Sequence, residues 1–229
     1  PYAGAGFKIY DPDGNPVTMT FTYPTPTTID VFYTNAEGSL VTPEKLPFGK
    51  GYSIVEVQAP YGYVLDETPV YFDVTEDNST EESGVTVVKV DKPNMAQKGT
   101  ITVEKTGEVF FGVSVIGGVD ESGNELPAIY QPQYEKRGLP GAVYEIIAAE
   151  DIITPDGTVR NQKGNVVDTV TTDENGTAVS RELYLGKYEV REITAPHGMV
   201  LNPEPHCVEL VYAGQNVAVT ETATSFENE

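Results

Sequence analysis

One short stretch of sequence occurs twice, as YSIVEVQAPYG at residues 52–62 and as YEVREITAPHG at residues 188–198. In each copy a tyrosine, an aliphatic residue and a glutamate occupy alternate positions, which indicates a strand with one buried face. Glu56 and Glu192 fall on that apolar face, where a carboxylate is costly unless another group pairs with it. The chain therefore contains two copies of one module, and each places an acid where an apolar residue is expected.

Strands separated by tight turns account for the rest of the sequence, which has no good helical pattern. Glycine and proline number 22 and 17, as suits short strands joined by turns. Turn sequences such as DPDGN at residues 11–15 and TDENG at residues 172–176 separate the apolar stretches. A chain of 229 residues with an internal repeat predicts two domains of ordinary size. We therefore expect an all-β protein of two tandem antiparallel β-sandwiches.

The boundary between the modules is expected within residues 91–98, DKPNMAQK, because proline and polar residues suit a linker. This places the first domain at residues 1–96 and the second at residues 97–229. The second domain opens with the strand GTITVEK, residues 99–105, which has no counterpart in the first. We therefore expect the first domain to lack its opening strand, and the second to carry an insertion at residues 106–138.

Charge and residue usage exclude several classes of function. The net charge of −21 argues against nucleic-acid binding and disfavours contact with anionic membranes. Cys207 is the single cysteine, so an internal disulfide is excluded and an extracellular domain must be held together in another way. His197 and His206 have no partners in the spacing of a zinc site or a hydrolase, so we expect no metal and no cofactor. The chain opens at Pro1 and reads as a piece of a longer protein.

Three polar residues of the second module fall on faces that are otherwise apolar. Lys105 continues the alternation of Ile101 and Val103, Glu192 lies in the repeated strand, and Asn228 closes the last strand. One domain therefore has a lysine near its start, an acid near its end and an amide at its end. This pattern predicts that the three side chains meet. The alternative is a buried salt bridge with an amide neighbour.

Such a meeting permits a specific reaction. Apolar surroundings disfavour charge, so a buried lysine and a buried glutamic acid both tend to be neutral. A neutral Lys105 amine is a nucleophile, and the side-chain carbonyl carbon of Asn228 is an electrophile. A protonated Glu192 can donate a hydrogen bond to that carbonyl oxygen and carry a proton to the leaving group. The predicted product is an amide between two side chains, formed once with loss of ammonia and without a cofactor.

The order of these features resembles the Cna B-type (SpaA-type) domains of Gram-positive surface proteins and pilins. It consists of a lysine in the first strand, LPGAVYEI at residues 139–146, TDENG at residues 172–176, the repeated stretch at residues 188–198 and a terminal asparagine. The resemblance implies Ig-like, prealbumin-like β-sandwiches that form an intramolecular Lys–Asn or Lys–Asp isopeptide bond with the help of a buried acid. It also implies an extracellular location at the cell wall.

The same resemblance implies roles for individual residues. Lys105 is the expected amine, Asn228 the acceptor and Glu192 the catalytic acid of an isopeptide cross-link. Glu56 occupies the matching place in the first module, where a buried acid without a reactive partner is an equally good interpretation.

The acceptor of the first module is left open between two residues. Asp91 has the position before x-Pro that the resemblance implies, and it alternates in phase with Val85 and Val87. Asn94 is the second candidate. Strand phase favours Asp91, because phase decides which side chains face the core. The lysine that would react there would lie on an upstream strand, or another chain would fill the open edge.

Two functions remain as predictions. In the first, the chain is a structural stalk or adhesin segment of a cell-surface protein or pilin, and its partners are neighbouring domains of the same protein. In the second, the sandwiches are binding modules, and the insertion at residues 106–138 presents a site for a glycan or a host matrix protein. A turnover enzyme is not expected, because the sequence shows no open catalytic constellation.

Overall fold

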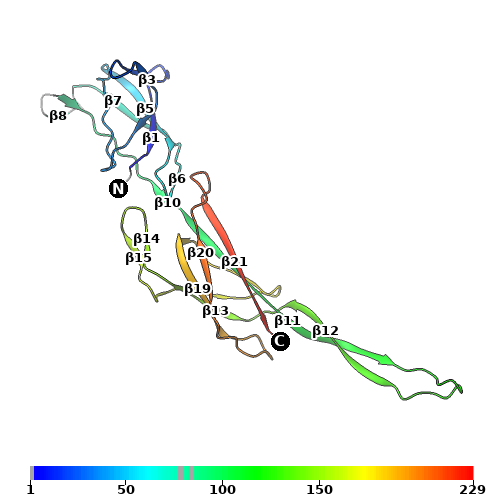
Figure 1. The fold of residues 1–229 in the computed structure, drawn as a ribbon. Helices are drawn as coiled ribbons and strands as arrows, with labels where there is room; N and C mark the ends of the chain where they lie inside the picture. Colours follow the sequence, from blue (N-terminus) through cyan, green and yellow to red (C-terminus); the bar gives the residue numbers. More distant parts are fainter. Residues whose placement is uncertain (1–2, 77–79, 83–84, 229) are drawn as a thin grey trace. The chain divides into compact units, whose positions relative to one another are not determined.

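The computed structural model describes residues 3–76, 80–82 and 85–228 (Figure 1). These residues form strands, turns and irregular segments and no helix, so the predicted all-β class is confirmed. No helix that could cross a membrane is found in this described part of the chain. Two compact units result: unit 1 comprises Pro1–Lys98, Ile153–Arg160 and Val211–Thr220, and unit 2 comprises Gly99–Ile152, Asn161–Leu210 and Glu221–Glu229.

Unit 1 is built on a four-stranded antiparallel sheet in the order β4-β1-β5-β7. These strands are β1 (Gly6–Tyr10), β4 (Phe32–Tyr33), β5 (Gly49–Gln58) and β7 (Val70–Val74). The core beside this sheet consists of Ile9, Met19, Phe32, Tyr52 and Val74. Three short pairs complete the described strands of this part: β2 (Met19–Phe21) with β3 (Thr27–Ile29), β6 (Tyr63–Val64) with β10 (Met95–Ala96), and β8 (Thr80–Glu82) with β9 (Val85–Val87).

Unit 2 consists of two sheets. The first has the order β16-β13-β19-β20, and the second joins β12, β11 and β17, with β18 and β21 also pairing with β11. Their bounds are β11 (Lys98–Ile116), β12 (Ile129–Gly138), β13 (Val143–Ala148), β16 (Val166–Thr171), β17 (Thr177–Val179), β18 (Leu183–Tyr184), β19 (Gly186–Thr194), β20 (His206–Leu210) and β21 (Val219–Asn228). A further short pair joins β14 (Ile152–Ile153) to β15 (Val159–Asn161), and its residues 153 and 159–160 belong to unit 1. Fully buried residues from both sheets, including Ile101, Ile146 and Phe226, form its core.

The two four-stranded sheets share one strand order, and the repeated sequence lies on the equivalent strands β5 and β19. In unit 1, Glu56 pairs with Phe7 across β5 and β1, next to a register shift. In unit 2, Glu192 pairs with Tyr144 across β19 and β13, again next to a register shift. The internal repeat is thus a structural repeat that delivers each glutamate to the same place in its sheet.

The two compact units do not simply follow one another along the chain. Its main boundary lies between Lys98 and Gly99, yet two segments from the second half, residues 153–160 and 211–220, belong to unit 1. Gln97 is buried in unit 1, where its amide donates to the carbonyl of Gly214 at 2.9 Å and accepts from the Ala213 amide at 2.9 Å. The division into residues 1–96 and 97–229 stays a prediction.

The insertion at residues 106–138 is a β-hairpin rather than a separate subdomain. Strands β11 and β12 pair from Thr106 opposite Gly138 to Ile116 opposite Ile129. Figure 1 shows the two paired strands continuing past the other strands of unit 2. We call the part of this hairpin between residues 107 and 137 the ribbon.

Candidate functional site

Strand β11 delivers a lysine into the core of unit 2. Ile101, Val103 and Lys105 alternate with partly or fully exposed residues, and all three are completely buried. The lysine is therefore on the inner face, as the sequence pattern predicted. The backbone around it is fixed on both sides, because the Lys105 amide donates to the Gly176 carbonyl at 2.7 Å and its carbonyl accepts from the Leu139 amide at 2.9 Å.

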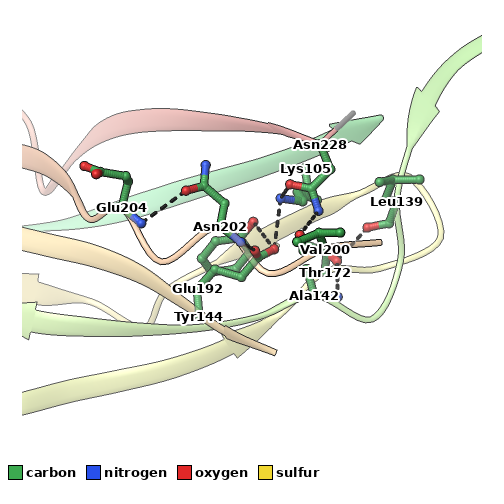
Figure 2. A network of polar contacts seen from close by, with 10 residues as sticks. All are labelled: Lys105, Leu139, Ala142, Tyr144, Thr172, Glu192, Val200, Asn202, Glu204 and Asn228. Atoms are coloured by element: carbon green, nitrogen blue, oxygen red, sulfur yellow. Dashed lines mark hydrogen bonds and ion pairs between the residues drawn. The ribbon is translucent and has the colours of Figure 1, made fainter. Parts of the chain in front are cut away.

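Two polar side chains from two other strands meet the side chain of this lysine (Figure 2). The Nζ atom of Lys105 lies 2.9 Å from Oε1 of Glu192 on β19. It also donates a hydrogen bond to Oδ1 of Asn228 on β21 at 2.6 Å. Lys105, Glu192 and Asn228 are 0%, 2% and 5% exposed, so water has almost no access to the cluster. The structure brings together the three residues that the sequence placed on inner faces.

The carboxylate of Glu192 has two further partners that sequence reasoning missed. Its Oε2 atom accepts a hydrogen bond from the Asn202 amide at 2.7 Å, and its Oε1 atom accepts one from the Tyr144 hydroxyl at 3.3 Å (Figure 2). Burial, and next the charge of Glu192, raise the pKa of Tyr144 well above its ordinary value, so the hydroxyl remains a donor. The only sequence signal for Tyr144 was its alternation in LPGAVYEI, which places its side chain inward.

The amide of Asn228 is held in one orientation. Its Nδ2 atom donates to the Val200 carbonyl at 2.9 Å, which leaves its Oδ1 atom directed at Lys105. The ring of Phe226 covers the cluster, with its centroid 5.9 Å from Nζ of Lys105 and 4.8 Å from the centroid of Tyr144. These aromatic rings make the surroundings of the amine apolar.

The turn at residues 172–176 closes the site from the side of β13. The Thr172 hydroxyl donates to the Leu139 carbonyl at 2.7 Å and accepts from the Ala142 amide at 3.0 Å (Figure 2). Gly176 has a φ of +78°, and a Cβ atom there would collide with the Lys105 carbonyl oxygen. A glycine is needed at Gly176 for both reasons, which explains why the TDENG turn accompanies the lysine.

The geometry of this cluster suits attack of an amine on an amide carbon. Because a C=O bond is about 1.23 Å long, Nζ at 2.6 Å from Oδ1 lies within about 3.8 Å of the Asn228 side-chain carbon. Groups held this close react with a high effective concentration. The described part of the chain holds no group of three or more His, Cys, Asp or Glu side chains that could bind a metal ion.

The first module has a related but different cluster. Glu56 is completely buried; its Oε1 atom accepts from Nδ2 of Asn94 at 2.7 Å, and its Oε2 atom accepts from the Asp66 amide at 3.1 Å. Asp91 is exposed. Strand β9 ends at Val87, so strand alternation does not extend to Asp91. The choice between Asp91 and Asn94 as the acceptor of the first module stays a prediction.

A comparison of the two glutamates shows what unit 1 lacks. Glu56 and Glu192 each accept a backbone hydrogen bond from the residue ten positions further along the chain. Phe7 pairs with Glu56 where Tyr144 pairs with Glu192, so the hydroxyl donor is missing. Among the described residues, the Asn94 amide contacts Glu56 and no lysine or arginine forms an ion pair with it.

Comparisons with known proteins agree with this architecture. The family model described as SpaA, prealbumin-like fold domain, matches residues 1–89 and 131–224. The trypsin-resistant surface T6 protein of Streptococcus pyogenes serotype M6 is 40% identical over 48 residues, which make up 21% of this chain and 9% of that protein.

Two solved structures are among those that match this chain. The TIE protein of Bacillus anthracis aligns with a TM-score of 0.51 and 24% identity, covering 99% of this chain and 31% of its own. The minor pilin GBS52 of Streptococcus agalactiae aligns with a TM-score of 0.32 and 17% identity, covering 100% of this chain and 83% of its own. The chain thus spans 31% of the TIE structure and 9% of the T6 protein.

Proposed function

Because the chain belongs to the family of SpaA prealbumin-like fold domains, we propose that it is a structural stalk segment of a Gram-positive cell-surface protein or pilin. Family membership confirms the predicted prealbumin-like fold, and the name of the T6 protein, a surface protein, supports the location. The segment would lie outside the cell at the cell wall, with neighbouring domains of the same protein as its partners. An isopeptide bond between Lys105 and Asn228 would stabilise it.

The double contact of Lys105 carries this proposal. One amine nitrogen lies at 2.9 Å from a carboxylate that can take its proton and at 2.6 Å from the amide oxygen beside the carbon that it would attack. A buried ion pair alone would not need the amide of Asn228 to be oriented by the Val200 carbonyl. These contacts support the proposed roles of Glu192 as base, Lys105 as nucleophile and Asn228 as electrophile.

The reaction balances without any added reagent. Lys105 gives one proton to Glu192, and its neutral amine attacks the side-chain carbon of Asn228. The tetrahedral intermediate then loses its Nδ2 nitrogen, which receives a proton from the former amine through Glu192 and departs as ammonia. An ammonium, a primary amide and a carboxylate become ammonia, a secondary amide and a neutral carboxyl group. The reaction occurs once in each molecule, so it is not enzymatic turnover.

The bond would change both the stability and the mechanics of unit 2. It would join residues that are 123 positions apart in the chain. By analogy with disulfides, closing a loop of that size stabilises the folded state by roughly 5 kcal/mol through the unfolded chain. Tension applied at the two ends of the unit would pass from β11 to β21 through the covalent link instead of through hydrogen bonds.

The intact mass of the purified chain tests the proposal. We expect a mass below that of the sequence by one ammonia, about 17 Da, and a proteolytic peptide that links the Lys105 segment to the Asn228 segment. Glu192→Gln should restore the full mass, because no carboxylate can then accept the proton. Glu56→Gln is the matched control: it changes the equivalent acid of unit 1 and should keep the mass deficit. Full mass in the unchanged protein would contradict the bond.

One observation favours a second candidate function. The ribbon exposes several large apolar side chains, among them Phe110, Tyr130 and Tyr134. Such a surface is expected if the insertion binds another molecule, as the alternative of a glycan or matrix-protein module requires. Removing the ribbon between Gly107 and Arg137 should then abolish binding to an array of glycans or to immobilised matrix proteins, while leaving the mass deficit of unit 2 unchanged.

A further inference from the structure

The ribbon has one apolar face that is left exposed by the described residues of unit 2. The register of β11 and β12 places Phe110 opposite Tyr134, Val113 opposite Pro132 and Val115 opposite Tyr130. Residues two positions apart in a strand share a face, so the three residues of β12 point to one side. An extra residue at the register shift between Phe110 and Gly112 keeps their partners on that side. The apolar face consists of Phe110, Val113, Val115, Tyr130, Pro132 and Tyr134.

Side-chain contacts agree with this assignment of faces. The rings of Phe110 and Tyr134 meet edge to face, with centroids 6.0 Å apart, so they lie on the same side. On the opposite side, Gln133 donates to the Ser114 hydroxyl at 3.0 Å. The ribbon is therefore amphipathic at its centre, with aromatic and aliphatic groups on one face and Gly, Ser and Gln on the other.

The apolar face is large enough for a specific interface. Phe110, Val113, Val115, Tyr130 and Tyr134 are 55%, 50%, 58%, 69% and 57% exposed. With aromatic side chains of 150–250 Å² each, the face presents on the order of 600 Å² of apolar surface. Two such faces in contact would bury about 1,200 Å² in total, the lower limit for stable protein–protein interfaces. A two-stranded hairpin is only marginally stable by itself, so covering this face also stabilises the ribbon.

Charge along the ribbon favours one orientation of two copies. Residues 109–119 and 126–134 contain no Asp, Glu, Lys, Arg or His, so the chain's net charge of −21 lies elsewhere. Asp120, Glu121 and Glu125 gather at the tip. Antiparallel copies keep the two acidic tips at opposite ends of the pair, whereas parallel copies place acid against acid.

We propose that the apolar faces of two copies of this chain pack against each other in antiparallel orientation and form a two-fold symmetric dimer. The symmetry axis passes near the pair of Val113 and Pro132, which lies at the centre of the face. A flat ribbon face is complementary to itself, as a two-fold interface requires.

Sedimentation velocity of the 229-residue chain over a range of concentrations tests this proposal. We expect a monomer–dimer equilibrium with a micromolar dissociation constant. Val113→Glu introduces a charge at the centre of the face and should weaken dimerisation at least tenfold. Ser114→Glu adds the same charge one residue away on the other face and should leave the equilibrium unchanged. A wild-type chain that stays monomeric at about 1 mM, or equal loss in both variants, would overturn the proposal.

A cross-linking experiment tests the axis independently. Cys207 is exposed and could link copies by itself, so the two cysteine variants of this experiment also carry Cys207→Ser. In that background Pro132→Cys should form a disulfide-linked dimer in mild oxidant, because the two thiols face each other across the axis. Gln133→Cys, on the other face, should form no disulfide-linked dimer. If Pro132→Cys does not cross-link faster than Gln133→Cys, the two-fold packing is wrong. If glycans instead bind a monomeric chain and Val113→Glu abolishes that binding, the face serves a glycan and the dimer is rejected.

Discussion

At the scale of single residues, the carboxylate of Glu192 is positioned by two donors that take no part in bond formation. The Asn202 amide holds Oε2 at 2.7 Å, and the Tyr144 hydroxyl holds Oε1 at 3.3 Å. The Oε1 atom is also the one that contacts Lys105. Tyr144 therefore acts on the oxygen that would accept the amine proton, and its contribution can be measured apart from the reacting groups.

Tyr144→Phe should slow formation of the cross-link without preventing it. The variant removes one hydrogen bond to a buried carboxylate, a loss of about 1–3 kcal/mol, and we expect a rate reduction of roughly 10- to 100-fold. The measurement is the fraction of molecules lacking one ammonia as a function of time after refolding. Tyr188→Phe is the control, because this buried tyrosine donates to the Tyr184 carbonyl instead. An equal slowing in both variants would show that the effect is only on packing.

The residues of the unit 2 cluster could be predicted because all three lie in long strands. Lys105, Glu192 and Asn228 each continue a period-two pattern, and that pattern survives in β11, β19 and β21. Tyr144 could be placed inward but not assigned a partner, because its contact with Glu192 depends on the register between two strands. The contact of Asn94 with Glu56 could not be predicted, because strand alternation ends at Val87 and gives no phase for the residues that follow.

At the scale of elements, an ion pair ties two connecting segments of unit 1 together. Lys92 contacts Asp66 at 2.7 Å and donates to the Thr68 carbonyl at 2.8 Å. The Asp66 amide in turn donates to Glu56, so these contacts hold the segment that covers the buried acid. The hydrogen bond from Lys92, and next those involving Thr68, hold the pKa of Asp66 well below its usual range.

This lowered pKa gives unit 1 a defined acid sensitivity. The unfolded chain takes up a proton at Asp66 near pH 4, whereas the folded chain does so only at a lower pH. The contribution of Asp66 is therefore complete above pH 4 and is lost as the pH falls through the folded pKa. Asp66→Asn should lower stability at pH 7 by no more than about 1 kcal/mol, since the carboxylate is half-exposed.

Urea unfolding of the wild type and Asp66→Asn between pH 7 and pH 2 measures this difference. The gap between their unfolding midpoints should be constant above pH 4 and should narrow steadily as the pH falls from 4 towards 2. The exposed neighbour Glu67 supplies the control, because Glu67→Gln should follow the wild type at every pH. A gap that stays constant with pH would show that Asp66 acts through packing rather than through its charge.

The sequence does not predict which side chains of the ribbon share a face. The sequence predicts an insertion at residues 106–138, but the side of the hairpin that is apolar depends on the extra residue between Phe110 and Gly112. A single inserted residue reverses the facing of every later side chain of that strand. The sequence alone therefore predicts an insertion, while the register defines the face formed with Pro132.

At the scale of the whole molecule, the proposed cross-link divides the chain into a part that can be stretched and a part that cannot. The loop between Lys105 and Asn228 spans 123 positions. An extended chain reaches about 3.3–3.6 Å for each residue, so the loop represents about 40 nm of length. When the chain is pulled from its two ends, a covalent bond between these residues keeps that length out of the extension.

Single-molecule pulling of the chain from both termini should therefore show a fully extended length that is short by about 40 nm. Lys105→Ala should recover the missing length, because it removes the amine and with it the bond. Lys136→Ala removes an exposed lysine that pairs with Glu227 and should keep the short length. If the wild type and Lys105→Ala extend equally, tension passes through the interior of unit 2, and its resistance to force rests on packing and hydrogen bonds alone.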